Sequence, residues 1–216
     1  MEALSFMAFS MLEWFSLIIL SFTMFKIEIR GFRGQIVFTS FLLSLLSYIL
    51  IVALDLVGYA TFLQPPIVFI FYWQMFRIPA FYAGLIMTNG YLAYIFLTSI
   101  SYIVLQQLGS ILVVPDTTIS FANQSVTALV ALLVAYAIYK YRIGYTFVPY
   151  YPNSNIKFTK INTRLLLFTI MGYLALTSFN FLYFLGNYTQ FIIIPITVSL
   201  VLLQYWVLKK EFSDDH

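Results

Sequence analysis

The stretch ALSFMAFSMLEWFSLIILSFTMF, residues Ala3–Phe25, decides the fold class, because Glu13 is the only charged residue in it. A helix needs about 20 mostly apolar residues to cross the hydrocarbon core of a bilayer. The preceding Met1 and Glu2 do not form the basic region of a secretory signal peptide, and the apolar run is too long for a signal core. The stretch therefore predicts a retained membrane-spanning helix.

The rest of the chain has the same character. Of its 216 residues, 62% are hydrophobic and 9% are charged, whereas a soluble domain carries about 25% charged residues. The sequence predicts an all-α, polytopic membrane bundle over residues 1–208, followed by a short cytoplasmic tail at 209–216. Its predicted spans are Ala3–Phe25, Ile36–Leu54, Leu56–Phe76, Ala80–Leu105, Phe121–Tyr139, Leu165–Leu185 and Phe191–Leu208.

The third predicted span contains Pro65 and Pro66 near its middle. Proline removes a backbone donor and kinks a helix, which a membrane tolerates only where neighbours satisfy the freed carbonyl groups. A re-entrant segment is the alternative to a kinked span. We favour the span, because the short turn at Asp55 suits a tight helical hairpin.

The positions of the charges favour one topology. With the N-terminus outside and seven spans, all 11 Lys and Arg residues fall in cytoplasmic segments, as the positive-inside rule predicts. Glu2, Asp55 and Asp116 then face outward. A re-entrant third segment would move the charges after the fifth helix to the outside. This placement also accounts for the net charge of +3 without a nucleic-acid partner.

Ordinary enzyme chemistry has little support in the residue types. The chain has no cysteine, and its single histidine is His216. No metal site of the usual His and Cys ligands can therefore be assembled. There is also no Gly-rich phosphate loop and no convergent Ser, His and Asp set. We expect no enzymatic activity, no cofactor and no metal.

Several polar residues are candidates for ligand binding. Glu13 lies at membrane depth, where a carboxylate is costly and therefore a functional hypothesis; a protonated Glu that bonds a neighbouring helix is the alternative. Asp55 and Asp116 lie where an outer ligand would arrive, although solvated loop carboxylates are the simpler interpretation. Mid-membrane amides and hydroxyls form a further set, in which interhelical hydrogen bonding is the simpler role. This set comprises Gln74, Thr88, Asn89, Thr177, Ser178, Asn180 and Gln204. Within it, Asn89 with Gly90 in the fourth predicted span and Ser178 with Asn180 in the sixth could face one cavity.

The inner loop carries aromatic residues beside lysines. Tyr145, Phe147, Tyr150 and Tyr151 are predicted to form a collar at the inner membrane surface. Beyond the last span, Lys209 and Lys210 begin the tail that would present a signal to a partner.

Three segments resemble a known family. The run EWFSLIILSFTMFKIEIRGFRGQIVFTSFLLSLLSYIL (Glu13–Leu50), FRIP (Phe76–Pro79) and TFVPYYP (Thr146–Pro152) are similar to the membrane portion of AgrC-like bacterial sensor histidine kinases with GHKL-type catalytic domains. The resemblance implies a sensor module that detects an extracellular cue, such as a peptide, and signals through its last helix. A dimerisation helix, a phosphoacceptor histidine and nucleotide-binding boxes are not found in these 216 residues.

Three functional hypotheses follow. The leading one is a non-catalytic sensor of a two-component system in the bacterial cell membrane, working as a homodimer or with a partner kinase. The second is a small transporter with Glu13, Asn89 and Asn180 along its path. The third is an accessory subunit of another membrane protein. A quorum-sensing membrane peptidase of similar size is excluded, because its catalytic cysteine has no counterpart here.

Overall fold

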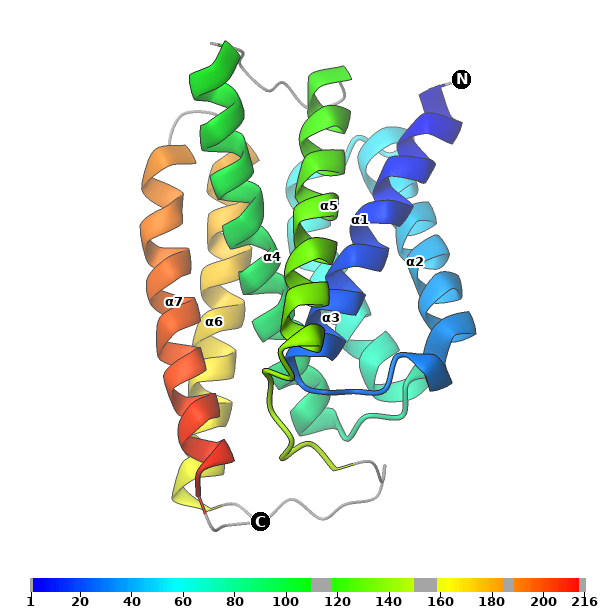
Figure 1. The fold of residues 1–216 in the computed structure, drawn as a ribbon. Coiled ribbons are helices and arrows are strands. Elements are labelled where there is room, and N and C mark those ends of the chain that lie inside the picture. The colour runs from blue at the N-terminus through cyan, green and yellow to red at the C-terminus, as the bar shows by residue number, and fades with distance from the viewer. Residues whose placement is uncertain (1, 110–117, 150–158, 185–188, 214–216) are drawn as a thin grey trace.

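The computed structural model describes residues 2–109, 118–149, 159–184 and 189–213. Within these ranges the chain forms seven α-helices and no strand (Figure 1). The helices are α1 (Glu2–Met24), α2 (Arg33–Tyr48), α3 (Val57–Ile70), α4 (Ala80–Gly109), α5 (Thr118–Lys140), α6 (Lys160–Phe184) and α7 (Thr189–Glu211), with a 3-10 turn η1 (Arg30–Phe32). The prediction of an all-helical bundle is confirmed.

The chain is a multi-pass membrane protein. Six described helical segments are long and apolar enough to cross a bilayer: Ala3–Met24, Arg30–Ala53, Ala80–Val104, Phe121–Lys140, Lys160–Ser178 and Ile193–Glu211. The predicted third span, Leu56–Phe76, is not among these six.

Two helices end in π-helical turns. The turn η2 (Ile49–Ala53) continues α2, and η3 (Phe71–Met75) continues α3. Helix α3 continues through Pro65 and Pro66 without interruption. Its π-turn closes at Phe76, whose N–H donates to the Phe71 carbonyl at 3.2 Å. A wider turn changes the direction of the backbone without a proline.

The helices pack into one bundle in which α1 and α4 hold central places. Helix α1 lies against α2, α4 and α5, while α4 also contacts α6 and α7, which pair with each other (Figure 1). An aromatic group fills the contact between α1 and η3. The Phe22 ring lies 5.6 Å from Tyr72 and 4.9 Å from Phe76, both edge-on, an arrangement that stabilises aromatic pairs beyond their burial.

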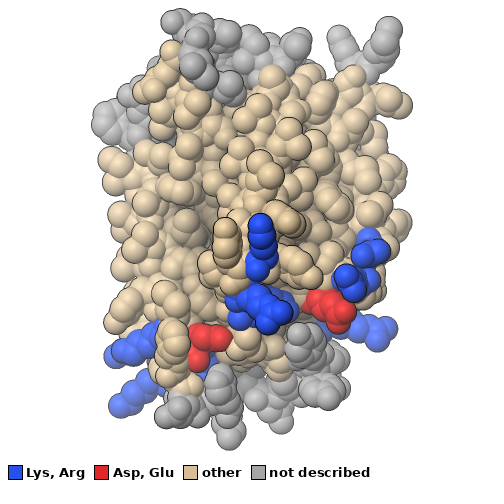
Figure 2. All heavy atoms as spheres, viewed as in Figure 1, with Lys and Arg blue, Asp and Glu red and all other residues tan. Residues whose placement is uncertain are grey.

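One end of the bundle holds all the described Lys and Arg residues, and we call it the basic end. It is formed by the ends of α1, η3, α5 and α7 and by the starts of α2 and α6 (Figure 1). On the visible face, the charged side chains gather toward this end (Figure 2). Its residues are Lys26, Arg30, Arg33, Arg77, Lys140, Arg142, Lys160, Arg164, Lys209 and Lys210.

Charged residues terminate four helical segments in the left-handed conformation. Lys26, Asp55, Arg77 and Arg142 have φ angles of 48°, 52°, 54° and 54°. At α1, the Lys26 N–H donates to the Thr23 carbonyl at 3.2 Å and the next N–H donates to the Phe22 carbonyl at 2.9 Å. This pattern is a Schellman motif, which glycine usually completes. A non-glycine residue there costs on the order of 1 kcal/mol or more.

The predicted helix boundaries are mostly within a few residues of the structure, and the start of α6 differs most. The sequence predicts a span that begins at Leu165, but α6 begins at Lys160. Thr159 explains the earlier start, because its Oγ1 accepts a hydrogen bond from the Asn162 N–H at 3.3 Å. A threonine at this position satisfies a backbone donor that the first helical turn leaves free. At the other end of the chain, α7 continues through Lys209 and Lys210 to Glu211.

Candidate functional site: a polar relay from α4 to the end of α7

A hydrogen bond joins the interior of α4 to α7. The Gln204 Nε2 donates to Asn89 Oδ1 at 2.6 Å, and Asn89 is fully buried. Hydrogen bonds of this kind hold membrane helices together. Asn89 therefore has the interhelical role that the sequence favoured, but its partner is on α7 and not among the predicted α6 residues.

The same Gln204 is held on its other side by the inner loop. The Tyr145 hydroxyl donates to Gln204 Oε1, so both ends of the amide are occupied. Tyr145 is half-buried beside Phe25, the residue that follows α1, with ring centroids 5.4 Å apart. Burial raises the pKa of the Tyr145 phenol, and the nearby Glu211 carboxylate raises it further. The phenol therefore stays protonated and remains a donor.

Next to Tyr145, the loop binds the last residue of α7. The Thr146 N–H donates to Glu211 Oε2 at 2.8 Å, and the Thr146 hydroxyl donates to Glu211 Oε1 at 2.6 Å. Hydrogen bonds to a charged acceptor are stronger than those between neutral groups. The loop thus connects the final turn of α7 to the rest of the basic end.

The loop is also fixed to α1. The Tyr145 N–H donates to the Met24 carbonyl at 2.9 Å, which is one of the carbonyls left free at the end of a helix. Gly144 has a φ of +136°, and a Cβ there would lie 2.8 Å from that same carbonyl oxygen. Only glycine allows this close approach. We call the connected set Asn89, Gln204, Tyr145, Thr146 and Glu211 the polar relay.

The last turn of α7 also carries the predicted relay lysines. The Lys209 Nζ lies 5.1 Å from the Trp206 ring centroid, and the Arg164 guanidinium of α6 lies 4.9 Å from it. Cations over a Trp face are attracted by the ring's quadrupole. Lys210 is buried. The two lysines thus belong to the helix and its packing, and not to a separate tail.

Glu13 lies in a second polar region, at the contact of α1 with α4. It is partly buried, and its charge would act on the phenols of Tyr91 and Tyr94. Both phenol oxygens are buried and have no hydrogen-bond partner among the described residues. The adjacent Trp14 instead donates from Nε1 to Ser47 Oγ of α2 at 3.1 Å. In the described part of the chain, no hydrogen bond links Glu13 to the polar relay.

Of the remaining predicted site residues, Asp55 is the one whose side chain the structure describes. Asp55 is exposed at the end opposite the basic end, in its left-handed turn. Asp116 lies outside the described residues, and so does the side chain of Asn180 on α6. Ser178, which was grouped with Asn180, is exposed. A shared cavity between α4 and α6 therefore has no support in the described residues.

Sequence reasoning missed two members of the polar relay and misplaced a third feature. Glu211 and Thr146 carried no signal beyond their polarity. Tyr145 and Phe147 were expected in an aromatic collar on the membrane surface, but Phe147 is buried and Tyr145 points to Gln204. Tyr150 and Tyr151, the other members of that collar, lie outside the described residues.

A small cavity adjoins the polar relay at the basic end. It has a volume of about 130 Å³ and lies between the end of α1, the η3 turn and the inner loop. Lys26, Arg77 and Thr146 supply its polar lining, and aromatic and aliphatic side chains supply the rest. The two cations are exposed to solvent, so the cavity opens toward the aqueous side of the basic end.

Comparison with known proteins finds no match to the chain among protein-family models, curated proteins or solved structures.

Proposed function

We propose that the chain is the membrane-embedded sensor module of a bacterial two-component signalling system. In this proposal seven helical segments cross the cell membrane, with the N-terminus outside and the basic end in the cytoplasm. The gathering of the described Lys and Arg residues at one end supports this orientation. The α3–η3 segment, which lies between the turns at Asp55 and Arg77, supports the seventh crossing.

The polar relay is the observation that carries the sensor proposal. It joins a buried amide of α4 to Gln204, and Gln204 to the loop that binds Glu211 at the end of α7. A ligand that favours one packing of α4 against α7 would change the position of that end. A ligand can shift such an equilibrium only by its difference in affinity for the two states. The end of α7 would then report the shift to a kinase.

A kinase fusion tests this proposal. A dimerisation and catalytic domain is joined after α7, and autophosphorylation is measured in membrane vesicles with conditioned medium from the source bacterium. We expect the medium to change the phosphorylation rate. We also expect Gln204→Leu to reduce that response, whereas the exposed Gln74 provides a matched control in Gln74→Leu. A fusion that ignores the medium, or that responds equally in both variants, argues against the proposal.

Cysteine labelling tests the topology separately. The native chain has no cysteine, so a single introduced thiol gives no background. Asp55→Cys and Arg77→Cys place exposed thiols before α3 and after η3. Seven crossings predict that an impermeant reagent labels Asp55→Cys from outside and Arg77→Cys only after the membrane is opened. Labelling of both thiols from one side would mean that α3 does not cross.

A small transporter is the second candidate, and Glu13 is the observation that favours it. This carboxyl lies inside a membrane helix near two buried phenols that lack hydrogen-bond partners among the described residues. Ionisable residues in such places are often part of a transport path. Proton flux into proteoliposomes that is lost in Glu13→Gln would support this function, and flux unchanged by the substitution would remove its only basis.

A further inference from the structure

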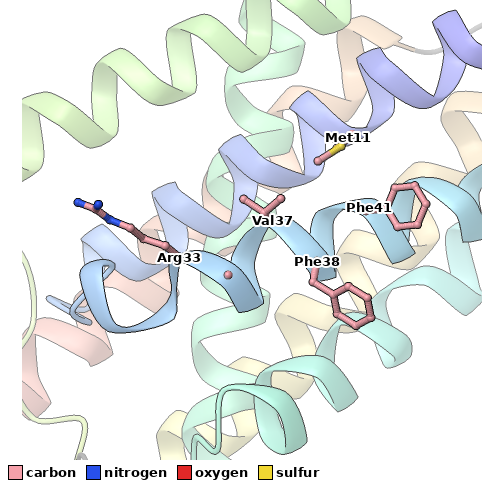
Figure 3. A pocket seen from close by; sticks show the side chains of 6 residues that line it. Met11, Arg33, Val37, Phe38 and Phe41 are labelled. Atoms are coloured by element: carbon pink, nitrogen blue, oxygen red, sulfur yellow. The ribbon is translucent and has the colours of Figure 1, made fainter.

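We propose that a groove between α1 and α2 binds one anionic phospholipid, with its phosphate at Arg33. The groove has a volume of about 610 Å³ and is lined by Met11, Arg33, Gly34, Val37, Phe38 and Phe41. Figure 3 shows Arg33 at one end of this set, with the apolar side chains extending away from it along α2. The proposal does not depend on the sensor function or on the direction of the chain in the membrane.

The spacing of the lining residues fits a single leaflet. Arg33 and Phe41 are eight positions apart on α2, which corresponds to about 12 Å along a helix. Half of the hydrocarbon core of a bilayer is about 15 Å. An acyl chain that begins at the level of Arg33 would therefore run past Phe38 and end near Phe41, close to the middle of the membrane.

The groove has a cation at one end and apolar side chains along the rest, which matches the charged head and apolar tails of a phospholipid. Arg33 belongs to the basic end and is exposed, and its guanidinium can bind phosphate through two parallel hydrogen bonds. Val37, Phe38 and Phe41 are exposed apolar side chains, which suit an acyl chain. One cation above an apolar groove complements an anionic amphiphile better than it complements a second copy of this chain, which would place another Arg33 nearby.

Gly34 keeps the groove open next to the cation. A Cβ built at Gly34 meets no atom within 4 Å, so a larger side chain would enter free space without displacing the protein. Gly31 is equally open but does not line the groove. Gly34→Leu would therefore fill the groove, and Gly31→Leu would make the same substitution outside it.

The test is the thermal unfolding of the full chain in detergent with added phosphatidylglycerol, phosphatidylcholine or inorganic phosphate. A bound lipid stabilises the folded state by mass action, so we expect phosphatidylglycerol to raise the midpoint on the order of 5 °C. Arg33→Gln and Gly34→Leu should lose most of this lipid-induced shift. Arg30→Gln and Gly31→Leu, which make the same changes outside the groove, should retain it.

Four results would overturn the proposal. Phosphatidylcholine could give an equal shift, which would indicate general solvation by lipid. Inorganic phosphate could reproduce the shift, which would indicate a free-anion site. The shift could survive in Arg33→Gln and Gly34→Leu. Finally, Phe38→Cys could form disulfide-linked dimers in phosphatidylglycerol bilayers, which would place a second copy of the chain on the groove.

Discussion

Replacing Gly90 by alanine should separate α1 from α4. A Cβ built at Gly90 would lie 2.7 Å from the Ser21 Cβ and closer still to the Ser21 Oγ. Rotation of the Ser21 hydroxyl would not relieve the contact between the two Cβ atoms. That rotation would also break the hydrogen bond that Ser21 Oγ donates to the Leu17 carbonyl at 2.7 Å. The two helices must therefore shift.

The size of the effect follows from three contributions. Overpacking a tight contact costs about 1–3 kcal/mol, and the loss of one hydrogen bond costs about 1 kcal/mol. The higher helix propensity of alanine offsets up to about 1 kcal/mol. We therefore expect Gly90→Ala to lower the free energy of unfolding by about 2 kcal/mol, measured by denaturation in mixed micelles.

A second substitution and a control on the same helix make the test specific. Ser21→Gly removes the Cβ that clashes, so it should stabilise the Gly90→Ala variant, although it destabilises the native chain by removing a hydrogen bond. Gly84→Ala is the control, because its Cβ would meet only the Phe69 ring at an ordinary 3.7 Å. If Gly90→Ala is as stable as the native chain, or if Ser21→Gly does not rescue it, the described contact of α1 with α4 is wrong.

Three further predictions concern single residues. Gln204→Leu should lower the free energy of unfolding by about 2 kcal/mol, because it leaves the Asn89 and Tyr145 side chains without their partner; denaturation in micelles measures this. Arg142→Gly should stabilise the protein by up to about 1 kcal/mol, because glycine adopts the left-handed conformation of this residue without strain. The free energy of unfolding should fall as the pH rises above about 10, where the phenol of an unfolded chain titrates, because burial raises the pKa of Tyr145 in the folded state.

Each of these has a contrary result. Equal stability of Gln204→Leu and the control Gln74→Leu would mean that the polar relay contributes nothing. A destabilised Arg142→Gly would show that the Arg142 side chain makes contacts that outweigh its backbone strain. The chain has 17 Tyr residues, so the decisive comparison is with Tyr145→Phe. An unchanged slope of stability against pH in that variant would contradict the assignment to Tyr145.

The helices could be predicted from sequence because each apolar run is long enough to need no tertiary information. The π-turns η2 and η3 could not be predicted, since no residue type marks them. The ends of the helices could be predicted in part. Each of the four left-handed positions has a charged residue between an apolar residue and a following Ile or Leu. These charged residues are Lys26, Asp55, Arg77 and Arg142. Sequence reasoning expects glycine there, so the pattern was not recognised.

The polar relay could be predicted only in part. Asn89 and Gln204 stood out as amides at membrane depth, because polar side chains there need partners. Their pairing could not be derived, since it joins residues 115 positions apart and depends on which faces of α4 and α7 meet. Tyr145 was misplaced because aromatic residues beside lysines usually lie at the membrane surface. Its hydrogen bond to Gln204 draws it into the bundle instead.

Hydrogen exchange of the inner loop tests most directly whether the interior of α4 is coupled to the end of α7. The amides of Tyr145 and Thr146 donate to Met24 and Glu211, and their protection is measured in lipid nanodiscs. Asn89→Leu removes the far end of the polar relay without touching the loop. The account predicts faster exchange at these amides, roughly five-fold for about 1 kcal/mol of lost coupling, as Glu211→Gln should also give. Unchanged exchange in Asn89→Leu, with faster exchange in Glu211→Gln, would contradict the account.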